Sequence, residues 1–133
     1  MEETSQQTPQ SEVPEVDAEL VAIEAAKARL TPPIAYRPLI LTIDDGTGTG
    51  KMMRVAFRRP NPAEWHRYRS DASNRDPEVQ ANALQVIVVP CAFYPAFNAF
   101  QKLIADRPGL IELLGGKLVD FAGLDALKKT ELL

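Results

Sequence analysis

Residues 37–64 read RPLILTIDDGTGTGKMMRVAFRRPNPAE, and within them the spacing of apolar residues changes from a period of two to a helical pattern. Apolar residues alternate with more polar ones on both sides of a glycine-rich loop, which is typical of paired β-strands with one buried face. The apolar positions that share one side are Leu39, Leu41, Ile43, Met53, Val55 and Phe57. The segment therefore predicts a β-hairpin over residues 38–58.

Two strands alone are marginally stable in water, so the hairpin has to pack on helices, pair edge to edge with another copy, or both. Its loop, Gly46–Lys51, superficially matches a phosphate-binding loop. However, Asp45 stands where that motif needs its first glycine, and Met52 stands where it needs Ser or Thr. The loop therefore predicts a turn, because glycine tolerates the positive φ angles of tight turns.

The hairpin is followed by helix-start signals. Asn61 can cap a helix, Pro62 suits its first position, and Glu64 can bond back to the cap amide. Asp76-Pro77 repeats the signal, and helical spacing continues to Pro90. The β-branched run at residues 85–89 also suits a strand, but the upstream cap favours a helix.

The remaining helices follow from apolar residues at steps of three and four. Such patterns run over residues 17–30, from Pro95 to Asp106 and from Leu110 to Phe121. A last turn or short helix is expected from Leu124 to Leu133. Together they predict an α+β, mostly α domain at residues 17–133: an N-terminal helix and a β-hairpin, then a bundle of about four helices over residues 62–131. Residues 1–16 lack aromatics and are rich in polar residues, which predicts a disordered acidic tail.

Charge is distributed unevenly along the 133 residues. Residues 1–26 carry −7, while the rest, with 15 basic against 11 acidic residues, carries +4. The stretch from Lys51 to Arg75 is the most basic, and it fits a solvated face better than a nucleic-acid surface. No run approaches the ~20 apolar residues that span a membrane, and the first residues do not resemble a signal peptide. We therefore expect a cytoplasmic protein with neither membrane nor nucleic acid as its partner.

Residues that could perform catalysis or bind metal are few and scattered. Cys91 is the single cysteine and His66 the single histidine, so a disulfide and a zinc site are excluded. Asp44 and Asp45 are adjacent in a strand and point to opposite faces. We therefore expect no catalytic, cofactor-binding or metal-binding residue, and hence no enzyme.

The C-terminal helices are unusually apolar, and a helix that is apolar on several sides is buried in something larger. The residues expected to form a partner-binding surface or to support it are Phe97, Phe100, Leu103, Leu110, Leu114 and Leu118. The same residues are equally compatible with an ordinary core. Arg58 and Arg59 are candidate contacts for an acidic partner or for the protein's own acidic segment.

Several short motifs occur in a characteristic order along the chain. They are Phe57-Arg58-Arg59-Pro60, Glu64, Trp65, Tyr68, Val88-Val89-Pro90-Cys91, Tyr94-Pro95, Arg107-Pro108-Gly109-Leu110, Leu114, Leu118 and Ala122-Gly123. In this order of segments the chain resembles the tail assembly chaperones of long-tailed, siphovirus-like bacteriophages. The resemblance covers about residues 36–124, and the acidic N-terminal segment falls outside it.

The resemblance implies a non-catalytic protein that coats the apolar helical tape-measure protein and recruits tail-tube subunits. Such a protein is present in the cytoplasm of the infected host and absent from the mature virion. The family commonly has a frameshifted longer product, and Lys128-Lys129 is compatible with a slippery run. Self-association stays open, and the alternatives are a structural tail or head component and a small nucleic-acid-binding regulator.

Overall fold

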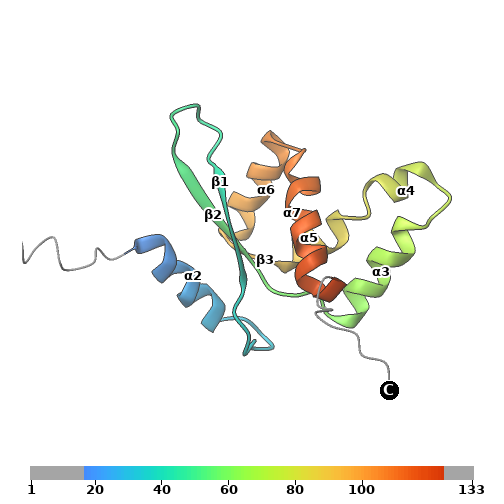
Figure 1. The fold of residues 1–133 in the computed structure, drawn as a ribbon, viewed down its shortest axis with the longest axis horizontal. Coiled ribbons are helices and arrows are strands. Elements are labelled where there is room, and N and C mark those ends of the chain that lie inside the picture. The colour runs from blue at the N-terminus through green and yellow to red at the C-terminus, as the bar shows by residue number, and fades with distance from the viewer. Residues whose placement is uncertain (1–16, 125–133) are drawn as a thin grey trace, which may run out of the picture.

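The computed structural model describes residues 17–124, which form an α+β fold in layers (Figure 1). A three-stranded antiparallel sheet in the order β1-β2-β3 has the helix α2 (Ala18–Ala28) on one side. The helices α6 (Phe97–Asp106) and α7 (Leu110–Val119) lie on the other side. The predicted α+β class is therefore confirmed. The predictions for residues 1–16 and 125–133 lie outside the described residues.

The predicted hairpin forms, and the structure defines its register. β1 (Leu39–Asp44) pairs with β2 (Met52–Phe57), which places Leu39 opposite Phe57 and Leu41 opposite Val55 on one face. The connecting loop is a turn, as predicted, and its glycines at 46, 48 and 50 all have φ near +80°. L-residues rarely adopt such angles, which explains why the loop alternates glycine with threonine.

The sheet has one strand more than the sequence predicted. The three residues of β3 (Ala92–Tyr94) pair with the end of β2, with a register shift between Ala56 and Phe57. The strand is short and carries no alternation that a sequence pattern could reveal. It gives β2 a second partner, so a marginal hairpin becomes a sheet.

The capping signals are confirmed at α3 (Pro62–Ala72). The Asn61 side chain accepts from the Glu64 amide at 2.8 Å, and Glu64 accepts from the Asn61 amide at 2.9 Å. The prediction of one helix from residue 77 to 90 is wrong. The chain forms α4 (Pro77–Ala81) and α5 (Gln85–Cys91), because the Asn82 side chain donates to the Glu78 carbonyl and closes α4 early.

The core lies between the sheet, α5, α6 and α7. Val55, Phe57 and Phe100 are fully enclosed, and the Phe57 and Phe100 rings pack edge to face with 6.2 Å between centroids. α7 continues through Gly115. The missing side chain of Gly115 makes room for Leu84, because a Cβ there would lie 2.9 Å from a Leu84 methyl group. A wide helical turn, η1 (Asp120–Leu124), follows α7.

Candidate functional site

The apolar residues expected to bind a partner are mostly core. The side chains of Phe100, Leu110, Leu114 and Leu118 are buried, and Leu103 is half-buried. Only Phe97 is open to solvent, with 64% of its surface exposed. In the folded chain, four of the six therefore support the fold and present nothing to a partner.

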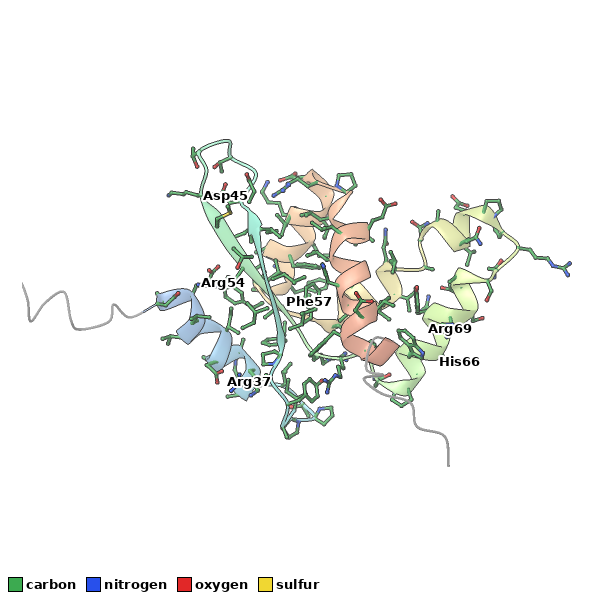
Figure 2. The ribbon with its side chains drawn as sticks, in the orientation of Figure 1. Arg37, Asp45, Arg54, Phe57, His66 and Arg69 are labelled. Carbon is green, nitrogen blue, oxygen red and sulfur yellow. The ribbon has the colours of Figure 1, made fainter. Side chains whose placement is uncertain are left out.

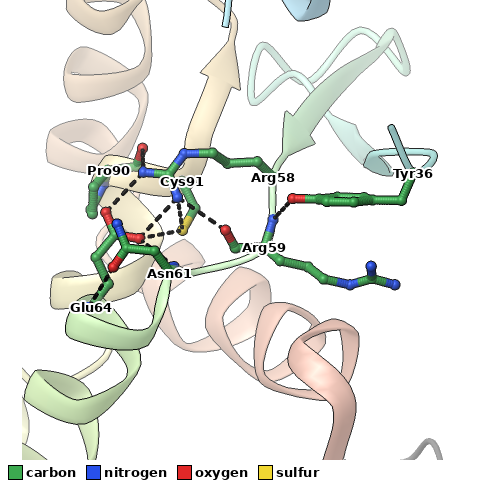
Figure 3. A network of polar contacts seen from close by, with 7 residues as sticks. All are labelled: Tyr36, Arg58, Arg59, Asn61, Glu64, Pro90 and Cys91. Carbon is green, nitrogen blue, oxygen red and sulfur yellow. Dashed lines mark hydrogen bonds and ion pairs between the residues drawn. The ribbon is translucent and has the colours of Figure 1, made fainter. Parts of the chain in front are cut away.

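Arg58 lies in a polar network within the chain (Figure 3). Its guanidinium donates to both Glu64 carboxylate oxygens, at 2.9 and 2.8 Å, and to the carbonyl of Pro90 at 3.2 Å. The hydrogen bond to Glu64 raises the pKa of Arg58 and lowers that of Glu64. Since Glu64 also caps α3, Arg58 fastens the start of α3 to the end of α5 and is not free for an acidic partner.

Arg59 is likewise engaged within the chain. Its guanidinium stacks on Tyr36 and Phe121, with its central carbon 4.3 and 4.6 Å from the two ring centroids. Its Nε donates to the Phe121 carbonyl at 3.1 Å, and its backbone amide donates to the Tyr36 hydroxyl at 2.9 Å. The stack joins the loop before β1 to η1, a contact between segments far apart in the sequence.

Two acidic residues of the N-terminal segment, Asp17 and Glu19, contact another arginine. Arg54 pairs with Asp17 at 2.9 Å and with Glu19 at 3.1 Å, and its backbone amide donates to Glu19 at 3.0 Å. The hydrogen bond from Arg54 lowers the pKa of Asp17. Asp17 and Glu19 thus fix the start of α2 against the sheet.

These contacts weaken the nucleic-acid alternative. Arg54, Arg58 and Arg59 all lie in the basic stretch, and all have partners within the chain. Figure 2 shows Arg54 and Arg69 on opposite sides of the molecule, so the stretch does not form one basic face. A phosphate backbone needs several cations on one side.

The residues considered for catalysis, Cys91 and His66, lie in different helices and differ in burial. Cys91 is fully buried, and burial raises the pKa of its thiol to about 12, so it is protonated at neutral pH. His66 is exposed on α3 (Figure 2). Among residues 17–124, no three His, Cys, Asp or Glu side chains come together as metal ligands. Within the same residues, no helix is long and apolar enough to cross a membrane.

An open groove lies between the helical arm and the body. The arm, defined as α3 and α4, stands at one end of the molecule, where α3 packs on α5 (Figure 1). The groove has a volume of about 830 Å³. Its apolar lining residues are Val79, Val86, Val89 and Pro90, and its polar lining residues are Arg67, Asp71, Asn74, Glu78, Asn82, Gln85 and Gln101.

The groove is open because neither α3 nor α4 fully buries a side chain. Arg67 and Asp71 lie on its α3 wall as an ion pair at 3.9 Å, one helical turn apart. Sequence reasoning missed this site because its residues come from four helices and look unremarkable singly. The sequence held no signal for it, because Val79, Val86 and Val89 fit the single helix predicted up to Pro90.

The structure is thus that of an α+β protein with an open surface groove lined by both apolar and polar side chains. That anatomy is typical of a surface that binds another protein. Compared with protein-family models, curated proteins and solved structures, the chain matches none.

Proposed function

We propose that this protein is a non-catalytic tail assembly chaperone of a long-tailed bacteriophage. In this role it binds the apolar helical tape-measure protein and helps to recruit tail-tube subunits. The proposal rests on the resemblance carried by residues 36–124, and the observation that supports it best is the open groove beside α5. The protein acts in the host cytoplasm and leaves before the virion is complete.

The groove suits a helix as its ligand. An amphipathic helix lays its apolar stripe on an apolar floor and keeps its polar flanks at the rim. Here Val79, Val86 and Val89 provide the floor, and charged residues such as Arg67 and Glu78 provide the rim. A tape-measure protein made of long amphipathic helices presents that stripe many times over.

A shallow groove also suits a reversible chaperone. Each contact buries little area and is weak by itself, but many copies on one long client gain through effective concentration. Weak single contacts allow tube subunits to displace the chaperone. The work of binding then falls on the half-buried valines of α4 and α5, since Phe100, Leu110 and Leu114 are already used in the core.

Co-expression with the tape-measure protein of a long-tailed bacteriophage tests the proposal. The wild-type chain keeps the client soluble, whereas Val86→Asp places a carboxylate on the groove floor and leaves the client aggregated. Val21→Asp is the matched control, because Val21 is 58% exposed on α2, away from the groove. A client that aggregates beside the wild-type chain, or that Val86→Asp protects equally well, contradicts the proposal.

The alternative of a structural tail or head component is separated by composition of the virion. A chaperone is absent from purified particles, and mass spectrometry of those particles checks this directly. Recovery of the chain in proportion to tail or head subunits would favour the structural role.

A further inference from the structure

β1 has a free edge whose hydrogen-bonding pattern can be worked out. The Asp45 amide donates to the Lys51 carbonyl at 3.0 Å, which makes that pair a hydrogen-bonded one. In an antiparallel ladder such pairs alternate, so the odd residues of β1 bond to β2 and the even residues point away from it. The Asp44 carbonyl agrees, because it accepts from the Arg107 side chain and not from β2.

The outward groups of Ile40 and Thr42 have no partner among residues 17–124. Both side chains are exposed, Ile40 to 38%. An edge of this kind is a template for another strand. In the described part of the chain, β1 carries neither a bulge nor a covering strand that would block one.

We propose that a second copy of this chain pairs with it through β1, antiparallel, about a two-fold axis beside Leu41. The inference is independent of the tail-chaperone proposal. In this register, Ile40 of each copy lies opposite Thr42 of the other, and the two residues exchange both backbone hydrogen bonds. The two half-buried Leu41 side chains meet across the axis. Two three-stranded sheets thereby become one continuous sheet.

The ends of the strand fit this register. By the same alternation, Pro38 of one copy lies opposite Asp44 of the other. Pro38 has no N–H to donate, and the Asp44 carbonyl that would accept it is already bonded to Arg107. The free Asp44 amide can instead donate to the Pro38 carbonyl. No backbone group in the paired strands is then left without a partner.

Charge complementarity favours a second copy over an unrelated strand. Arg37 and Asp45 lie at opposite ends of β1 in Figure 2, both accessible to solvent at least in part. The two-fold register brings Arg37 of each copy opposite Asp45 of the other. Opposite charges directly across a strand pair stabilise it, and the symmetry provides the contact twice.

Sedimentation equilibrium of the full chain tests the inference. The wild-type chain shows a concentration-dependent mass that rises to that of two chains. Arg37→Glu and Asp45→Lys each place like charges at both contacts and weaken dimerisation about tenfold. The double variant, Arg37→Glu with Asp45→Lys, restores it, which no general loss of folding could do.

Thr42→Pro is the second test, because it removes an outward N–H without touching a bond to β2. It abolishes the dimer, whereas Thr42→Val, which keeps the N–H, does not. A wild-type chain that stays monomeric at all concentrations overturns the inference. This holds also where slow amide exchange at Ile40 and Thr42 shows that another segment of the same chain covers the edge of β1. A dimer indifferent to the charge variants and to Thr42→Pro overturns it too.

Discussion

The α6–α7 region and the helical arm of α3 and α4 each consist of two consecutive helices, yet they differ in what they bury. Phe100, Leu110 and Leu114 close the first against the sheet, whereas no side chain of the arm is fully enclosed. Apolar content thus marks where the chain folds, and incomplete burial marks where it can bind. The more apolar region is the poorer candidate for a partner surface.

The largest expected difference is between shortening a side chain in the core and shortening one at the groove. Leu114→Ala empties space in a closed core and lowers the free energy of unfolding by about 2–5 kcal/mol. Val86→Ala on the half-buried groove floor costs about 1 kcal/mol or less. Urea unfolding of both variants measures the difference. Equal losses would mean that the groove is closed in solution.

The two adjacent glycines of α7 sharpen the comparison within one helix. Gly115→Ala forces a Cβ to 2.9 Å from a Leu84 methyl group and 3.2 Å from its Cβ, and it destabilises the chain by about 1–3 kcal/mol. Gly116→Ala meets nothing within 4 Å and stabilises it by about 0.5–1 kcal/mol. Thermal unfolding of the pair distinguishes the signs. A stabilising Gly115→Ala would contradict the close packing of α7 on Leu84.

The ion pair at the junction of α3 and α5 makes the stability of the fold depend on pH. Arg58 lowers the pKa of Glu64 in the folded state below its ordinary value of 4.5. The pair therefore stabilises the fold above that value, and its contribution is lost as the pH falls through the lowered pKa. Glu64→Gln costs roughly 1–3 kcal/mol at neutral pH, since the Glu64 side chain is only 19% exposed.

Urea unfolding at neutral pH and at a pH well below 4.5 checks this expectation. The gap between wild type and Glu64→Gln closes at the lower pH. A gap of constant size would show that the carboxylate charge does not hold the junction.

The smallest effect is expected at the opposite side of the sheet. Arg54→Gln removes the pairs with Asp17 and Glu19, which water and salt already screen. We expect a loss of stability smaller than that of Glu64→Gln, and one that shrinks further at high salt. Unfolding measured at low and high salt tests it, and a large loss independent of salt would contradict the surface character of the contact.

Sequence predicted best what is decided locally. The Asn61–Glu64 capping box and the glycine-rich turn of the hairpin follow from residues within a few positions of one another, and both are confirmed. The strand Ala92–Tyr94 could not be predicted, because its only reason to be extended is the distant end of β2.

The candidate site was less predictable than the fold. Residue type alone cannot separate a core leucine from a surface one, so Phe97 and Leu114 looked alike although one is exposed and the other enclosed. The groove depends on how α3, α4 and α5 meet, which no single segment encodes. Arg58 and Arg59 looked like free cations because their partners, Glu64 and the rings of Tyr36 and Phe121, are found only in three dimensions.

We propose that a client helix binds in the groove beside α5. Nuclear magnetic resonance titration of the full chain with an amphipathic tape-measure segment tests it most directly, with a peptide of the same composition but scrambled apolar positions as control. We expect changes in amide chemical shift to cluster at Val79, Val86 and Val89 with the amphipathic segment and to be absent with the scrambled one. Shifts confined to other surfaces, or equal shifts with both peptides, would contradict it.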